Sequence, residues 1–103
     1  MPKTETPMMA PVHPGSMLKE DFLDPLGVSQ YRLAQAISVP PRRTNEIVHD
    51  TRRISADTAL RLSRFFGMSD EFWMNLQGHY DIEVEKDKLS TALADIEPLA
   101  AAS

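Results

Sequence analysis

Two adjacent prolines near the middle of the chain, Pro40 and Pro41, constrain the local fold more than any other feature of the sequence. Proline disfavours the helical conformation in the residue before it, so Pro40 holds Val39 extended and ends any preceding helix. Pro41 has its φ angle fixed near the helical value, and it lacks an amide hydrogen that the first turn of a helix would leave unpaired. The stretch ISVPP therefore predicts a tight turn followed by a helix that begins at Pro41.

Apolar residues with helical spacing lie on both sides of this turn. Four of the periodic segments follow a serine that is expected to cap the helix N-terminus: Ser16, Ser29, Ser55 and Ser69. Glycines at positions 27 and 67 are expected to end two of them. The sequence predicts an all-α fold, a compact five-helix bundle, with helices within residues 16–26, 29–37, 41–49, 55–66 and 69–88.

The two ends of the chain carry weaker patterns. Residues 1–12 are rich in proline and have no apolar periodicity, so we expect a flexible N-terminal arm. The folded domain is expected over residues 13–88, with a frayed C-terminal tail at 89–103. Tyr80, Ile82 and Val84 alternate as in a strand, but no segment elsewhere in the chain offers a partner strand, so helix is favoured there.

The charge is unevenly distributed along the chain. The 103 residues carry a net charge of −4, yet residues 29–64 hold seven arginines, no lysine and three acids. Residues 65–103 hold eight acids against two lysines. A guanidinium group binds phosphate or a base edge through two parallel hydrogen bonds, so the arginine-rich middle indicates anion recognition.

Several classes of function lack support in the sequence. The chain has no cysteine, and His13, His49 and His79 have no metal-ligand spacing, so we expect neither a metal site nor a cofactor. No catalytic motif is recognisable, and an enzyme is not expected. No apolar run is long enough to cross a bilayer and no signal peptide is visible, so the protein is expected in the cytoplasm.

Two helices joined by a tight turn predict a helix-turn-helix, in which the second helix enters the major groove of DNA. Arg42, Arg43 and Asn45 would project outward from that helix and read base edges. Four residues are expected to contact the DNA backbone: Gln30, Thr44, Arg52 and Arg53. Thr44 also falls on the core face of the same helix, with Ile47 and Val48.

A solvated charged turn remains the alternative for Arg42 and Arg43, and an ordinary charged loop for Arg52 and Arg53. If the two helix arginines are tucked against acids of the same chain, or the tip of their helix is covered, the interpretation as a gene-control protein is expected to fail. Arg61 is expected on the outer face of its helix. The aromatic cluster at 65–80 is expected to be core, although Trp73 and Tyr80 could also form a dimer interface.

The sequence resembles the HigA family of antitoxins, within the Cro/repressor-type helix-turn-helix proteins. Residues 13 to about 85 carry the resemblance, in the stretches HPGSML, FLDPLGVSQYRLAQAISVPPRRTNEIV, RRISADTALRLSRFFGMSDEFWMNLQ and HYDIEVEK. The resemblance implies a homodimer that binds a palindromic operator before its own operon and neutralises a HigB-like toxin, a RelE-type mRNA-cleaving protein. Ser38 occupies the turn position where such repressors usually have glycine, and a left-handed backbone there would cost about 1 kcal/mol.

Two other functions remain open at this point. The chain could be a stand-alone helix-turn-helix transcriptional regulator without a toxin partner. It could also be a protein-interaction module that never binds DNA, in which case no salt-dependent DNA affinity would be found.

Overall fold

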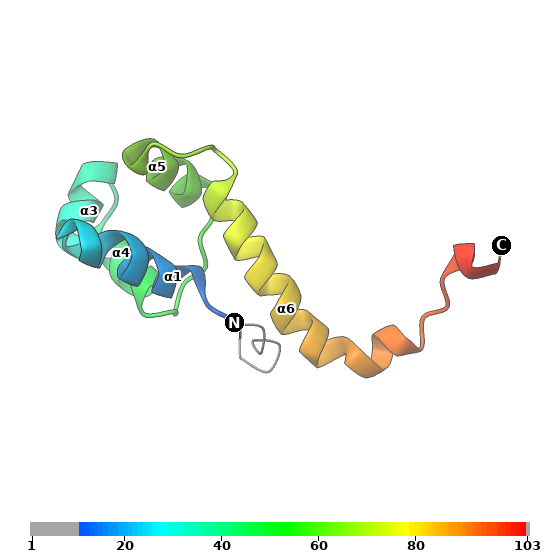
Figure 1. The fold of residues 1–103 in the computed structure, drawn as a ribbon. Coiled ribbons are helices and arrows are strands. Elements are labelled where there is room, and N and C mark those ends of the chain that lie inside the picture. Colours follow the sequence, from blue (N-terminus) through cyan, green and yellow to red (C-terminus); the bar gives the residue numbers. More distant parts are fainter. Residues whose placement is uncertain (1–10, 103) are drawn as a thin grey trace, which may run out of the picture.

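A computed structural model describes residues 11–102 of the chain, and every regular element in that range is a helix (Figure 1). This confirms the predicted all-α fold. The helices that surround the predicted turn pack into a compact body, and the last long helix projects from it toward the C-terminus. The predicted arm at residues 1–12 lies mostly outside the described residues, and the two that are described, Pro11 and Val12, are not helical.

The first helical segment is continuous but changes its hydrogen-bonding pattern twice. It consists of α1 (Pro14–Met17), the π-helical segment η2 (Leu18–Leu23) and α2 (Asp24–Leu26). Pro25 cannot donate a backbone hydrogen bond, and the amide of Asp24 bonds to the Lys19 carbonyl five residues back. Gly27 ends the segment in a left-handed conformation, as its position in the sequence indicates.

The N-terminal cap of this segment is His13, so the predicted cap at Ser16 is wrong. The Nδ1 atom of His13 accepts a hydrogen bond of 2.9 Å from the amide of Gly15. Gly15 itself packs against helix α4 (Pro41–Val48), because a Cβ atom at this position would lie 1.8 Å from the carbonyl oxygen of Ile47. The absence of a side chain therefore allows α1 to pack directly on that helix.

Helices α3 (Gln30–Ile37) and α4 (Pro41–Val48) form the predicted helix pair. The Ser29 hydroxyl caps α3 by accepting a hydrogen bond from the amide of Arg32 at 3.0 Å. Ser38 ends α3 with φ 60° and ψ 50°, so a serine does adopt the left-handed conformation that usually favours glycine. Pro40 is extended and Pro41 is the first helical residue, which confirms the expected start of α4.

Helix α5 (Ala56–Phe66) is capped by the Ser55 hydroxyl and ends at Gly67, which is left-handed, as predicted. Helix α6 (Phe72–Ala94) follows. Glu71 occupies its N-cap position without a capping side-chain bond, so the expected cap at Ser69 is wrong. The core between these helices contains a group of almost completely buried side chains: Leu18, Leu23, Leu33, Ala34, Ile47, Ile54, Ala59, Leu62 and Trp73.

The C-terminal region is more helical than predicted. Helix α6 continues to Ala94, six residues beyond the expected end at 88, and the 3-10 helix η3 (Leu99–Ala102) follows. Residues 88–94 include leucine and alanine, which have high helix propensity, and this propensity outweighs the lack of packing. The prediction of a frayed tail from residue 89 is therefore wrong. The division of the chain into arm, domain and tail stays a prediction.

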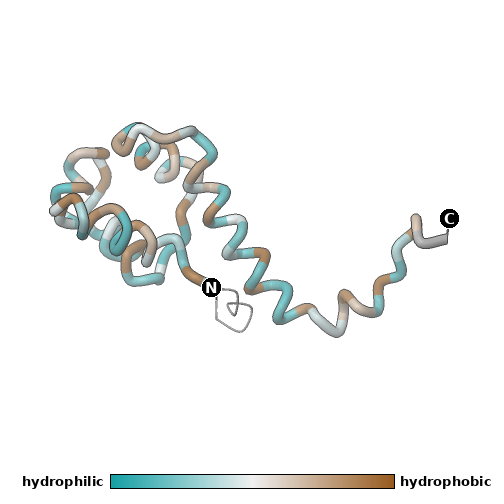
Figure 2. Tube along the Cα trace, viewed as in Figure 1, coloured by the Kyte–Doolittle hydropathy of each residue, from teal (hydrophilic) through white to brown (hydrophobic). Residues whose placement is uncertain are grey.

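Helix α6 has apolar residues on two opposite sides. Figure 2 shows hydrophobic and hydrophilic residues alternating along its whole length, including the half that leaves the body. Trp73 and Tyr80 pack toward the body, whereas Ile82, Leu89 and Leu93 are exposed. At 100° per residue, these last three positions share one side of the helix, roughly opposite Trp73. That side has no cover from the described residues.

Candidate nucleic-acid interface

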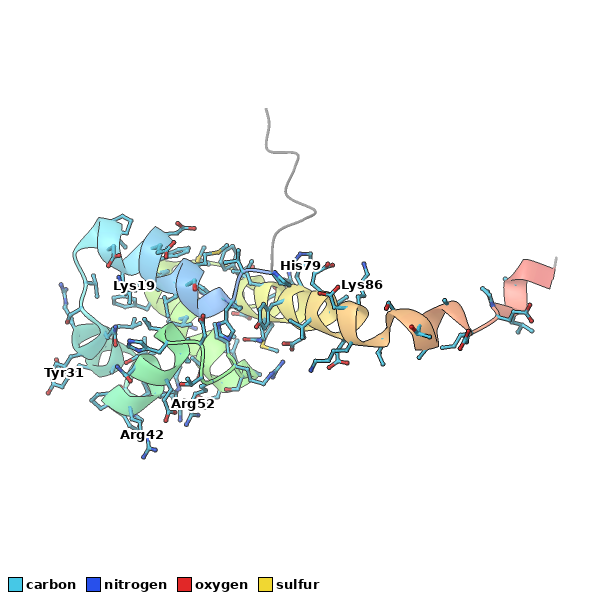
Figure 3. The ribbon with its side chains drawn as sticks, turned by 90° about the horizontal axis from the view of Figure 1, so that it is seen from below. Lys19, Tyr31, Arg42, Arg52, His79 and Lys86 are labelled. Carbon is cyan, nitrogen blue, oxygen red and sulfur yellow. The ribbon has the colours of Figure 1, made fainter. Side chains whose placement is uncertain are left out.

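The outward face of α4 is fixed by the burial of its inner face. Thr44, Ile47 and Val48 are buried, as predicted for the core side of this helix. Arg42 and Asn45 consequently lie on the exposed side. Figure 3 shows Arg42 and Arg52 along one edge of the molecule, with Tyr31 of α3 nearby and Lys86 of α6 far away.

Arg42 and Arg43 differ in accessibility. The Arg42 side chain is 84% exposed, and its Nε donates a 2.9 Å hydrogen bond to Glu46 one turn further along the helix. The Arg43 side chain is only 28% exposed, and its Nη1 donates to Asp57 of α5 at 2.9 Å. The expectation that both arginines project freely from the helix tip is therefore wrong for Arg43, which packs between α4 and α5.

Both arginines thus pair with acids of the same chain, which was expected to rule out DNA binding. That criterion is too strict, because intramolecular ion pairs of this kind do not exclude DNA binding. An exposed pair contributes only about 0–1 kcal/mol, because water and salt screen the charges. A phosphate or guanine edge can replace the carboxylate at little cost. The carboxylates also engage the arginines mainly through Nε or one Nη atom, which leaves further guanidinium donors available.

Asn45 and Gln30 form a polar bridge between the two helices of the motif. The amide nitrogen of Asn45 donates to the side-chain oxygen of Gln30 at 3.2 Å. Asn45 is exposed and Gln30 is half-buried at the first position of α3. The structure thus brings together a predicted base-reading residue and a predicted backbone-contacting residue.

Thr44 has a structural position that rules out its predicted contact with the DNA backbone. Its side chain is 1% exposed, and its hydroxyl donates toward the carbonyl oxygens of Gln30 at 3.2 Å and Pro41 at 3.0 Å. A buried hydroxyl with these partners holds α3 and α4 together and is not available to a phosphate. Only the alternative placement of Thr44 on the core face is confirmed.

Arg52 and Arg53 follow α4 and are both exposed, but they face different parts of the molecule. Arg52 Nε donates to Glu46 at 2.9 Å, beside Arg42. Arg53 pairs with Asp81 of α6. Asp81 also accepts a hydrogen bond of 2.9 Å from Gln77, whose side-chain oxygen accepts 2.7 Å from the amide of Ile54. The loop after α4 is therefore fastened to α6.

The three acids that hold these arginines are all more acidic than usual. Hydrogen bonds from Arg52 and Arg42 lower the pKa of Glu46, and those from Arg61 and Arg43 lower the pKa of Asp57. Burial alone would raise the pKa of Asp81, but the hydrogen bonds from Arg53 and Gln77 outweigh it and lower the pKa. All three carboxylates are thus favoured in the charged form that pairs with arginine.

Two contacts that support this surface have no counterpart among the sequence-based expectations. Arg61 of α5 donates to the carbonyl oxygens of Ile37 at 2.8 Å and Ser38 at 3.3 Å, and so caps the end of α3 at the strained turn. Its expected place on the outer face of the helix does not include this role. Gln77 of α6 is buried, and its side-chain oxygen accepts a hydrogen bond from a backbone amide in the loop after α4. Neither contact has a local sequence signal, since the partners lie more than twenty positions away.

The predicted dimer contacts have different positions in the structure. Trp73 is completely buried among Phe22, Phe66 and Phe72 of the same chain, so its assignment to a dimer interface is wrong. Tyr80 is half-buried and its ring meets that of His13 edge-on at 4.9 Å. Tyr80 alone remains a candidate for such an interface.

No group of three or more histidine, cysteine or acidic side chains within residues 11–102 is arranged to hold a metal ion. In the same range, every helix is too short or too polar to span a membrane.

A helix pair joined by a tight left-handed turn, with Arg42 and Asn45 exposed on its second member, defines a helix-turn-helix protein. A family model described as Helix-turn-helix matches residues 18–73. The chain therefore belongs to the helix-turn-helix family and, within it, to the HigA-like antitoxins.

Individual relatives support this placement. The antitoxin HigA of Pseudomonas aeruginosa, solved with the higBA promoter, is 41% identical with a TM-score of 0.82, over 86% of this chain and 98% of that one. An addiction module antidote protein of the HigA family from Coxiella burnetii is 40% identical with a TM-score of 0.81, over 87% and 99% of the two chains. Virulence-associated protein I of Dichelobacter nodosus is 49% identical over 80% of this chain and 77% of its own length.

Proposed function

We propose that this protein is the antitoxin of a type II toxin–antitoxin system and a homodimeric, sequence-specific repressor of its own operon. The observation that carries the proposal is the exposed face of α4, where Arg42 and Asn45 are accessible and Arg42 lies beside Arg52 along one edge (Figure 3). The similar HigA of Pseudomonas aeruginosa was solved with the higBA promoter, which supports DNA binding by this chain.

In this proposal α4 enters the major groove. Arg42, Arg43 and Asn45 read base edges, and Gln30, Arg52 and Arg53 contact the phosphate backbone and fix the register. Arg43 and Arg53 leave Asp57 and Asp81 when DNA offers better partners, whereas Arg42 and Arg52 contact DNA through the terminal nitrogens that Glu46 does not engage. We assign no catalytic activity to the protein and place it in the cytoplasm, where the operator DNA of its bacterial relatives lies.

Dimerisation follows from the small size of the recognition surface. One helix of eight residues offers few base contacts, whereas two copies about 34 Å apart read a palindrome that repeats after one helical turn. We place the interface on α6, where Tyr80 is partly exposed. Titration of the purified protein with the DNA upstream of its own gene tests the proposal, and binding no tighter than to unrelated DNA would contradict it.

Arg52→Ala is expected to weaken binding to operator and unrelated DNA by a similar factor, because a phosphate contact carries no sequence information. The salt dependence should also become shallower, since the slope of log K against log salt decreases by roughly one when one fewer phosphate is neutralised. Titrations at several salt concentrations measure both quantities. A weakening confined to the operator would instead make Arg52 a base-reading residue.

We place the binding site for the toxin on the C-terminal half of α6. Its exposed apolar side, formed by Ile82, Leu89 and Leu93, lies among the acids of a segment that carries more acids than lysines. Such a surface is complementary to a basic protein, as expected for an mRNA-cleaving toxin.

Co-expression with the product of the adjacent open reading frame is expected to yield a complex that purifies as a unit. Replacement of Ile82 and Leu89 by aspartate should prevent this without changing operator affinity, and the Arg42→Ala variant should still form the complex. If the wild-type protein binds its operator but does not co-purify with the neighbouring product, the stand-alone transcriptional regulator is the better description.

A further inference from the structure

Glu46 lies at the centre of the proposed DNA-binding surface but carries the same sign of charge as DNA. It is on α4, one turn after Arg42, and its side chain is 25% exposed. One carboxylate oxygen accepts from Arg42 Nε and the other from Arg52 Nε, each at 2.9 Å. A single carboxylate thus joins a predicted base-reading arginine to a predicted phosphate-contacting arginine.

This geometry has two physical consequences for DNA binding. The bridge neutralises part of the positive charge that would otherwise attract any phosphate backbone, so it disfavours unspecific binding. It also uses only the Nε atom of Arg42. The two terminal nitrogens of that guanidinium remain free to donate to guanine O6 and N7, and their direction is fixed by the bond at Nε.

We propose that Glu46 is a specificity-determining residue, which orients Arg42 for base reading and restrains Arg42 and Arg52 from indiscriminate phosphate contacts. The inference rests on the proposed DNA binding through α4. The acids Asp57 and Asp81 do not have this role, because each pairs with an arginine while it also accepts bonds from its own structural partners, Arg61 and Gln77.

The Glu46→Gln variant keeps the size of the side chain but loses its charge. Affinity for unrelated DNA is expected to rise roughly twofold to fivefold, which is the change expected when one exposed ion pair is released. Operator affinity should rise less, or fall, because Arg42 is no longer oriented. The ratio of operator to unspecific affinity therefore decreases. Both affinities are measured in parallel by titration with operator and with unrelated DNA of equal length.

Glu83→Gln is the matched control, since it removes one negative charge from α6, where Glu83 pairs with Lys86 away from Arg42 and Arg52 (Figure 3). It should leave the affinity ratio unchanged. The proposal is overturned if Glu46→Gln leaves unspecific affinity unchanged, or if both affinities rise by the same factor. A wild-type protein without operator preference would instead contradict the proposed function, so the two failures are distinguishable.

Discussion

Replacing both Arg42 and Arg43 with alanine is expected to weaken operator binding by at least about thirtyfold. Each bidentate contact between arginine and guanine contributes about 1–3 kcal/mol of discrimination, so removing two amounts to about 2 kcal/mol or more. Operator affinity should fall more than affinity for unrelated DNA. Titration of a labelled operator at several salt concentrations measures this difference.

The double variant Lys86→Ala/Lys88→Ala provides the control for charge. It also removes two positive charges, but from α6, where both lysines pair only with nearby acids at 3.7 and 3.8 Å. Its operator affinity should stay close to that of the wild-type protein. If the Arg42/Arg43 variant also binds the operator with unchanged affinity, α4 is not the base-reading helix.

Folding should be little affected in the Arg42/Arg43 variant. Weaker operator binding can therefore be attributed to lost DNA contacts and not to unfolding. Arg42 makes only the exposed pair with Glu46, which has Arg52 as a second partner. Arg43 shares Asp57 with Arg61, so the acid keeps a counter-charge after the substitution. The exposed Arg42 pair contributes little to the free energy of unfolding, and the loss of the less exposed Arg43 leaves Asp57 bonded to Arg61.

Much of the fold could be predicted because its signals are local. Ser29 and Ser55 cap their helices, Gly27 and Gly67 end theirs, and the proline pair starts α4, all from residues next to the element concerned. The errors fall where local signals compete. At the first helix, Ser16 has the side chain of a good cap, but His13 provides a ring nitrogen two residues before Gly15 and takes that position.

At the candidate site, the exposed and buried faces of α4 could be predicted, but the side-chain contacts could not. The exposed and buried sides of α4 follow from helical periodicity, which correctly placed Ile47 and Val48 inside and Arg42 outside. The partners of Arg43 and Arg53 lie on α5 and α6, fourteen and twenty-eight positions away. Such pairings depend on how the helices pack, and sequence spacing alone does not contain that information.

The error at Trp73 has the same origin, because an amphipathic aromatic residue suits an interface as well as a core. The structure decides between them. Its indole ring lies 5.0 Å from Phe22 and 5.2 Å from Phe72, centroid to centroid, and none of the residue is exposed. Trp73 therefore joins α6 to the first helical segment within one protomer.

The Trp73→Ala variant is accordingly expected to lose about 3–5 kcal/mol of its free energy of unfolding, as for other large aromatic residues removed from a core. Since domains of this size are stabilised by only about 5–15 kcal/mol, a substantial fraction of the variant should unfold well below the wild-type melting temperature. Leu26→Ala, at a position 63% exposed, is the control and should change stability by less than about 0.5 kcal/mol. Chemical denaturation at several protein concentrations distinguishes the two locations of Trp73. A core residue destabilises the chain by the same amount at every concentration, whereas an interface residue would show its effect mainly through weaker dimerisation.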